Sequence, residues 1–163
     1  QNEYVLLART LHQQKVDLVG MFSVLGGGFN YKFVQELPDV AQHMIDTNHW
    51  FDPTNPKAQA KKKQVEAKGS LFTFEVYLSY NAVKFLAEGF ERAGSADKDK
   101  VNAALAGSTW SDHFMPYGPT KMVNGQNTGG KASIQQASRT DIDVIWPSKF
   151  ASAKPVFPKP KFS

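Results

Sequence analysis

Three consecutive glycines give the clearest indication of a binding site in this chain. Gly26, Gly27 and Gly28 follow an apolar run with β-branched residues and precede a helical pattern. Glycines at such a place let a ligand approach the backbone, and they expose N–H groups at the positive end of a helix, which suits a carboxylate. The segment lacks the Gly-Lys-Ser/Thr ending of a phosphate loop. We therefore predict that Gly26, Gly27, Gly28 and Phe29 contact a ligand; a plain connection between two elements is the alternative.

A second group of candidate residues stands at the start of a long helical pattern. Phe74 and Glu75 lie between two further aromatic residues, Phe72 and Tyr77. The carboxylate of Glu75 can pair with an ammonium group, and the aromatic rings can wall an apolar side chain. The alternative is structural: an acidic residue stabilised by the helix dipole, next to aromatic residues of the core. Phe74 and Glu75 are therefore candidate ligand-binding residues.

No group of side chains predicts catalysis or a metal site. The histidines share no spacing typical of metal ligands: His12, His43, His49 and His113. Residues 111–113 have the types Ser-Asp-His, but neighbours in sequence rarely converge as a catalytic triad. The absence of cysteine excludes disulfides, thiol catalysis and cysteine-type zinc sites. We predict a protein that is not an enzyme and uses no cofactor.

The composition is that of a globular protein. Hydrophobic residues make up 41% and aromatic residues 12% of the 163 residues, and a chain of this length buries roughly two-thirds of its unfolded surface. The formal net charge of +4 is mildly basic, yet the positive residues are scattered except at 61–63 and 154–161. We predict no nucleic acid partner; DNA binding through the lysines at 61–63 is a weak alternative. No apolar run is long enough for a transmembrane helix, and the first residues do not form a secretory signal.

Strand and helix patterns alternate over the first seventy residues. Apolar residues at i, i+3, i+4 and i+7 predict an amphipathic helix at 2–15. The elements expected next are a strand buried on both faces at 16–24, a helix at 31–37 stopped by Pro38, a strand at 41–48 and a polar helix at 57–68.

The following residues predict a helical hairpin that ends at Gly107. Gly94 can adopt the left-handed conformation that ends a helix, and Ser95 or Asp97 can cap the next helix. An apolar stripe of the first helix should face a core. Its residues are Val76, Tyr80, Val83, Ala87 and Phe90.

The last third predicts an irregular segment, short strands and an extended tail. Residues 108–119 are rich in aromatic residues, proline and glycine; the strands expected after them lie at 120–123, 132–137 and 142–146. Four prolines from residue 147 onward exclude regular structure in the tail. Alternating strands and helices followed by a small antiparallel portion indicate an α/β fold with a mixed sheet.

Several motifs occur in the order typical of one known family. They resemble solute-binding proteins of branched-chain amino acid-type ABC importers, over nearly the whole chain but only over the second half of the family. The chain is therefore expected to be a C-terminal fragment of such a protein. The motifs are Phe-Val-x-x-Leu at 33–37, Tyr-x-Ala-Val at 80–83, Ala-Gly-Ser at 93–95, Val-x-x-Ala-Leu at 101–105, Gly-Gln-Asn-Thr-Gly at 125–129 and Val-x-Trp-Pro at 144–147.

The resemblance implies a type I periplasmic-binding-protein-like fold. The chain would supply parts of two three-layer α/β lobes with mixed sheets. Residues 1–48 and 119–163 would belong to lobe two and residues 54–112 to lobe one. Residues 49–53 and 113–118 would be the hinge crossings.

The same resemblance implies a periplasmic solute-binding component of an ABC importer. It would capture a small ligand between two lobes and deliver it to the membrane permease. This chain has Leu25 and glycines where amino acid binders carry a Glu for the ammonium group, so amides and aromatic or other organic acids are allowed besides amino acids. The alternative is a ligand-sensing domain of a receptor or regulator with the same fold. With part of a lobe absent, exposed strand edges favour a homodimer of the fragment.

Overall fold

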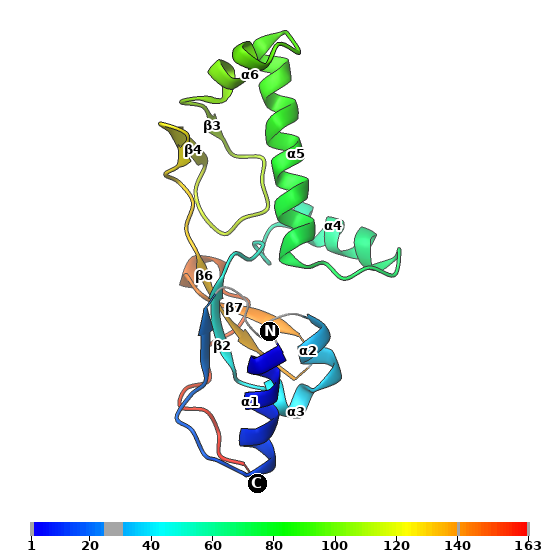
Figure 1. The fold of residues 1–163 in the computed structure, drawn as a ribbon, viewed down its shortest axis with the longest axis vertical. Coiled ribbons are helices and arrows are strands. Elements are labelled where there is room, and N and C mark those ends of the chain that lie inside the picture. The colour runs from blue at the N-terminus through cyan, green and yellow to red at the C-terminus, as the bar shows by residue number, and fades with distance from the viewer. Residues whose placement is uncertain (1, 25–30, 140, 163) are drawn as a thin grey trace.

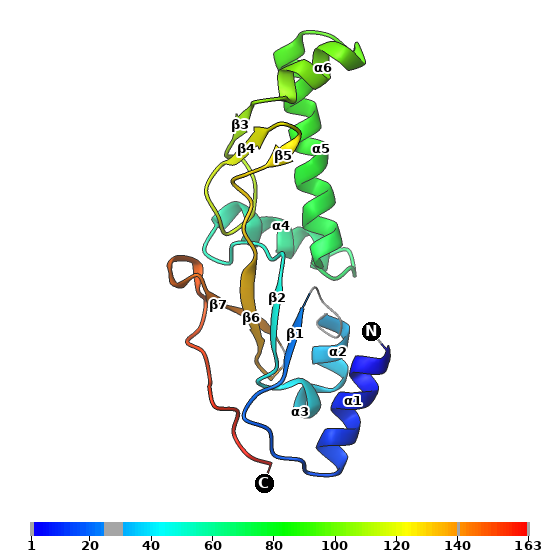
Figure 2. The ribbon, with the colours of Figure 1, turned by 60° about the vertical axis from the view of Figure 1, so that its left-hand side comes forward.

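The computed structural model of the chain describes residues 2–24, 31–139 and 141–162. Two units are joined end to end in an elongated molecule (Figure 1). Of the described residues, those up to 48 and from 133 onward form the sheet unit, and residues 54–127 form the helical unit. Residues 49–53 and 128–132 cross between them (Figure 2).

The sheet unit is built on one mixed sheet of four strands. β1 pairs with β2 in parallel, whereas β2, β6 and β7 pair antiparallel. The strand order is β1 (Phe22–Val24), β2 (Ile45–Asn48), β6 (Ser133–Ala137) and β7 (Ile142–Trp146). The sequence predicts such a mixed α/β arrangement.

Three helices cover one face of this sheet (Figure 1). They are α1 (Asn2–Gln13), α2 (Tyr31–Glu36) and α3 (Pro38–Ala41). Ala8 of α1 and Val34 of α2 are buried, and they share one core cluster with Val144 of β7. The core of the sheet unit therefore lies between the helices and this face.

The opposite face of the sheet is open. It carries an apolar groove of about 480 Å³ to which β1, β2, β6, β7 and Phe157 of the tail contribute. Phe22 and Val24 expose 61% and 66% of their surface. The prediction of a strand buried on both faces is therefore wrong. β1 lies at the edge of the described sheet, and the described helices cover only one of its faces.

Local backbone geometry shortens two predicted strands, and a separate short helix follows the helix predicted at 31–37. Lys15 has a φ of 50°, and residues 16–21 after it form a connection that leads to β1. His43, with a φ of 67°, separates α3 from β2. Pro38 was expected to stop a helix; α2 ends at Glu36, and Pro38 itself begins α3, since proline fits the first position of a helix.

The helical unit contains three helices and a small antiparallel sheet. Its elements are α4 (Pro56–Glu66), α5 (Phe74–Ala93), α6 (Lys98–Leu105), β3 (Thr109–Trp110), β4 (Thr120–Val123) and β5 (Gln126–Asn127). Gly94 ends α5 with a φ of 55°, and the Asp97 side chain caps α6 by accepting from the backbone N–H groups of Asp99 and Lys100. These termini confirm the predicted hairpin.

The buried face of α5 differs from the predicted stripe. Val83 and Phe90 are 67% and 42% exposed, whereas Tyr77, Asn81 and Gly89 are buried. Gly89 faces α6 so closely that an added Cβ would lie 2.8 Å from Leu105. Because α6 and the segment after it occupy this side of α5, the buried face is rotated from the stripe that apolar spacing alone predicts.

The pairing of β4 with β3 places residues 120–127 in the helical unit. The family resemblance instead implies that residues 119–163 belong to the same lobe as residues 1–48. After β6 and β7, the chain forms a short 3-10 helix, η1 (Ser148–Phe150), and an extended tail. Across the described residues, no helix combines the length and apolar character needed to cross a membrane.

Candidate functional site

The two segments that connect the units leave the sheet side by side. β2 ends at Asn48 and β6 begins at Ser133, and these residues are partners in the strand register. Directly after β2, the carbonyl oxygen of His49 accepts a hydrogen bond of 3.0 Å from the Tyr77 hydroxyl of α5. Neighbouring crossings of this kind allow two rigid units to hinge relative to each other.

Polar side chains are buried on the helix-covered face of the sheet at this junction. The buried polar residues are Asp46, Asn48, Ser133 and Gln135. The Ser23 hydroxyl donates to Oδ1 of Asp46 at 2.9 Å. Nε2 of Gln135 donates to the Ser133 hydroxyl at 2.5 Å. The residues share one face because Asp46 lies opposite Gln135, and Asn48 lies opposite Ser133.

Two amide atoms of this polar cluster have no hydrogen-bond partner within the described part of the chain. They are Nδ2 of Asn48, a donor, and Oε1 of Gln135, an acceptor. A buried polar atom left unpaired costs about 1–3 kcal/mol, and such atoms in proteins usually have a partner. Asn48 and Gln135 therefore carry hydrogen-bonding capacity that the surrounding described residues do not use.

An aromatic cluster lies between the two units. Tyr31 at the start of α2 packs against Trp50, with ring centroids 5.6 Å apart, and Trp50 packs edge-on against Tyr77 at 6.1 Å. Phe51 and Phe72 complete the cluster. Burial raises the pKa of the Tyr31 and Tyr77 hydroxyls, so both stay neutral donors near pH 7. Aromatic rings in such a cluster can line a site for an apolar part of a ligand.

Lys62 of α4 reaches from the helical unit to the sheet unit. Its Nζ lies 3.7 Å from Oδ2 of Asp141, which precedes β7, and 3.9 Å from Oε1 of Glu66 on its own helix. The same ammonium group lies 5.2 Å from the centroid of the Tyr31 ring. Lys62 thus forms an electrostatic contact between the units beside the aromatic cluster.

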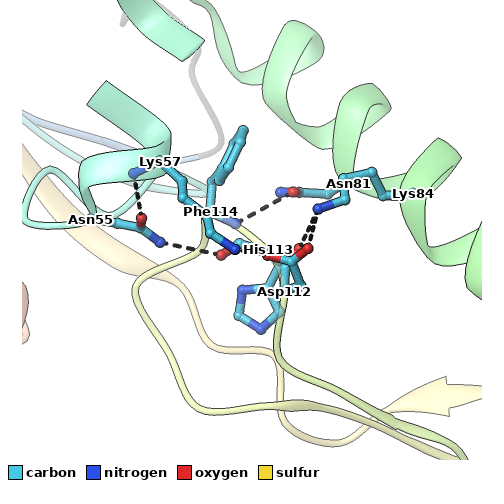
Figure 3. Close-up of polar contacts among 7 residues, drawn as sticks. All are labelled: Asn55, Lys57, Asn81, Lys84, Asp112, His113 and Phe114. Carbon is cyan, nitrogen blue, oxygen red and sulfur yellow. Dashed lines mark hydrogen bonds and ion pairs between the residues drawn. The ribbon is translucent and has the colours of Figure 1, made fainter. Parts of the chain in front are cut away.

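A second ion-pair network fixes the segment that follows β3 (Figure 3). Asp112 accepts hydrogen bonds from Lys57 of α4, at 2.7 Å, and from Lys84 of α5. These bonds, that from Lys57 first, lower the pKa of Asp112 to about 2. Oδ1 of the buried Asn81 accepts from the backbone N–H of Phe114 at 3.3 Å. The network therefore holds the 112–114 segment against α4 and α5 (Figure 3).

The adjacent Ser111, Asp112 and His113 do not form a catalytic relay. Asp112 pairs with two lysines, while His113 uses its ring nitrogens on the backbone: Nδ1 accepts from Met115 N at 3.2 Å, and Nε2 lies 3.1 Å from Gly118 O. Burial lowers the pKa of His113 and favours its neutral form. No group of three or more His, Asp or Glu side chains among the described residues is arranged to hold a metal ion.

The residues predicted to bind ligand are only partly within the described structure. Gly26, Gly27, Gly28 and Phe29 lie outside the described residues. Phe74 is half-buried and packs against the core as the first residue of α5, and Glu75 is exposed in the same turn. The start of α5 lies at the end of the helical unit nearest the sheet unit (Figure 1). Their role in ligand binding stays a prediction.

Sequence reasoning missed the polar cluster of the junction. Asn48 and Gln135 lie in segments that were predicted as strands, but no site was assigned to them. The available indication was local: amides at the end of one short strand and within another, where buried strands usually carry apolar residues. Only the register of β2 with β6 brings these two segments together.

Comparison with known proteins identifies the family. A family model described as periplasmic binding protein matches residues 1–140, so the chain belongs to the periplasmic binding protein family. Among solved structures, the chain is similar to the leucine-binding protein LivK from Thermotoga maritima, with a TM-score of 0.69 and 17% sequence identity. The match covers 88% of this chain and 41% of that protein, so the chain spans less than half of its length. No curated protein matches the chain.

These findings confirm the resemblance and the fold predicted from the sequence. The fold is that of type I periplasmic binding proteins, with helices and sheets in two units, and the four-stranded sheet is mixed as predicted. The family and the fold are those of binding proteins rather than enzymes, and the family is typically extracytoplasmic.

Proposed function

We propose that this chain is part of a periplasmic solute-binding component of an ABC importer. It would capture a small ligand between two lobes and hand it to a membrane permease. The observation that carries this proposal is the junction, where two side-by-side connections meet a buried cluster with unused hydrogen-bonding groups. The family match over residues 1–140 supports the same role.

We assign the sheet unit to one lobe and the helical unit to the other. The crossings in this proposal are residues 49–53 and 128–132. The second crossing replaces the predicted one at 113–118, because β4 and β5 pair with β3 before the chain returns to β6. The segment at 113–118 then belongs to the helical unit and is held there by Asn81.

The ligand classes that fit are amino acids, amides and aromatic or other organic acids. Nδ2 of Asn48 needs an acceptor and Oε1 of Gln135 needs a donor. A carboxamide or an amino acid offers both in one small group. The predicted contacts of Gly26, Gly27, Gly28 and Phe29 with a carboxylate are compatible with this assignment. Phe74 and Glu75 would supply an apolar wall and a partner for an ammonium group.

Capture would work as a shift between open and closed arrangements of the lobes. A ligand held by both lobes binds the closed arrangement more tightly and so increases its population. The Lys62–Asp141 contact and the aromatic cluster join the two units in the present arrangement. A permease that recognises the closed arrangement would then receive loaded protein selectively.

The test is isothermal titration calorimetry of the complete protein that carries this chain. Separate titrations use free amino acids, primary amides and aromatic carboxylates, and we expect one-to-one binding of at least one class. Gln135→Leu should weaken that binding by about tenfold, since it leaves a buried donor of the ligand without an acceptor, at a cost of about 1–3 kcal/mol. Glu75→Gln should weaken the binding of ligands that carry an ammonium group.

Two matched variants control for nonspecific effects. Gln126→Leu changes an exposed residue of β5, and Glu91→Gln changes an exposed residue near the far end of α5. Both should bind like the unchanged protein. If all three ligand classes fail to bind, solute capture is contradicted. If a ligand binds but its uptake by cells does not depend on the protein, the sensor alternative replaces the transport role.

A further inference from the structure

A separate cavity lies at the end of the sheet unit farthest from the helical unit. Its volume is about 370 Å³. It is formed between the end of α1, the residues around α3 and the C-terminal tail, beside the end of the chain marked C in Figure 1. We call it the tail pocket. The lining residues used below are His12, Asp39, His43, Lys159, Lys161 and Phe162.

The tail that forms one wall of this pocket is held in place. The backbone N–H of Lys159 donates to Val19 O at 2.8 Å, and that of Phe162 donates to Oδ1 of Asp17 at 3.0 Å. The Phe162 ring packs edge-on against the His12 ring, with centroids 5.1 Å apart. Since these contacts come from both ends of the segment, the tail pocket has fixed walls rather than a loose cover.

The charged groups of the pocket are mainly positive. Lys159 and Lys161 contribute two ammonium groups, and Asp39 contributes one carboxylate. That carboxylate lies 3.7 Å from the guanidinium of Arg139. The ammonium of Lys159 lies 3.8 Å from the centroid of the Phe162 ring and 3.3 Å from Pro160 O. The ammonium group of Lys159 is therefore held by a ring and a carbonyl group.

Two imidazoles complete the lining. Nδ1 of His12 is buried and has no hydrogen-bond partner among the described residues. The backbone of His43 is fixed on β6, because its N–H donates to Ala137 O at 2.8 Å and its carbonyl oxygen accepts from Nε2 of Gln136 at 3.1 Å. Burial first, and the nearby charge of Lys159 second, lower the pKa of His43. An anion between these groups would offset that repulsion.

We propose that the tail pocket binds a small oxyanion, a molecule that carries a phosphate or carboxylate group. Lys159 and Lys161 supply charge-assisted donors, and His12 and His43 supply imidazole N–H groups. The volume of about 370 Å³ leaves room for a small organic body besides the charged group. This site lies in one unit only and is separate from the junction, so it does not depend on the proposed capture of a solute.

The test follows the imidazole signals of the chain by NMR during titration with inorganic phosphate and, separately, with succinate. Chloride is adjusted to keep the ionic strength constant. We expect saturable shifts of His12 and His43 and a higher pKa for both imidazoles in the bound state, since a bound anion favours their charged forms. The charged groups that line the pockets around His43 are Asp39, Arg139, Asp143, Lys154, Lys159 and Lys161, and Asp17 lies near Lys159; all are present in both the free and the bound state. Binding of only one of the two anions distinguishes a phosphate site from a carboxylate site.

Charge-matched variants decide whether the pocket is responsible. Lys159→Gln and Lys161→Gln should each weaken binding by about tenfold, the worth of a hydrogen bond to a charged group. Lys161 is exposed, so its variant keeps the test valid if Lys159→Gln fails to fold. Lys98→Gln makes the same charge change on α6, in the other unit, and should leave the affinity unchanged. The proposal is overturned if neither anion shifts His12 and His43 in a saturable way, or if the Lys98 and Lys161 variants lose affinity equally.

Discussion

Large apolar side chains are buried at the junction and exposed on the outer surfaces of the molecule. At the junction, Tyr77 is 0% and Trp50 2% exposed. On the outer faces, Val83 of α5 is 67% and Val24 of β1 66% exposed. The junction receives side chains from both units, whereas the described helices leave the open face of the sheet uncovered, and Phe157 of the tail lies there with its ring centroid 6.2 Å from that of Phe22. Burial at the junction therefore matches that of the sheet unit's own core, and a hinge motion between the units must rearrange the contacts within the aromatic cluster.

The largest effect should come from removing a ring of the junction. Tyr77→Ala deletes a fully buried side chain that contacts Trp50, Phe51 and Phe72. We expect a loss of about 3–5 kcal/mol in the free energy of unfolding, measured by urea denaturation. Val83→Ala on the same helix is the control and should cost less than about 0.5 kcal/mol, because the side chain is already exposed. Equal losses would contradict the concentration of packing at the junction.

A smaller effect should come from a buried hydrogen bond near the junction. Asn81→Ala leaves the backbone N–H of Phe114 without its side-chain acceptor. We expect a loss of about 1–3 kcal/mol, the cost of an unpaired buried donor, by the same denaturation measurement. Asn102→Ala on the exposed face of α6 should change stability by less than about 0.5 kcal/mol. A loss no larger than this control would mean that Asn81 does not hold the 112–114 segment.

The succession of helices and strands was predictable because it depends on local sequence. Gly94 and Asp97 mark the end of α5 and the start of α6, and both have the geometry expected of their residue types. Burial was harder to predict. The apolar spacing of α5 pointed to Val83 and Phe90, but the contacts of α6 with Gly89 decide which side of the helix is covered.

The candidate site was predictable only in part for a related reason. Asn48 and Gln135 are 87 residues apart in the chain and come together through strand pairing. The side-chain network of Asp112 likewise joins α4, α5 and the segment after β3. Neither arrangement leaves a local pattern in the sequence, since each depends on the register or the packing of distant elements.

The ion pair that joins the two units should contribute less than the buried contacts. A double-mutant cycle with Lys62→Gln and Asp141→Asn measures the coupling between the two side chains. We expect a coupling of at most about 1 kcal/mol, because the carboxylate of Asp141 is 55% exposed. Lys62→Gln combined with Glu66→Gln is the matched cycle within α4. A coupling with Asp141 below the error of the measurement would show that the aromatic cluster alone joins the units.

The smallest effect should come from Asp112, and it should depend on pH. The lysine partners lower the pKa of this carboxyl from 3.8 to about 2 in the folded chain. The unfolded chain therefore binds more protons between these two values, so the stabilisation by Asp112 is complete above about pH 4 and is lost as the pH falls toward 2. Because the side chain is 46% exposed, solvent screening limits the difference in unfolding free energy between the unchanged chain and Asp112→Asn to about a few tenths of a kcal/mol.

Urea denaturation from pH 2 to pH 6 should show this difference at the upper end of the pH range and not at the lower end. Sodium chloride at about 1 M should reduce it through screening of the two lysine charges; a difference that ignores both pH and salt would mean that Asp112 acts through packing rather than charge.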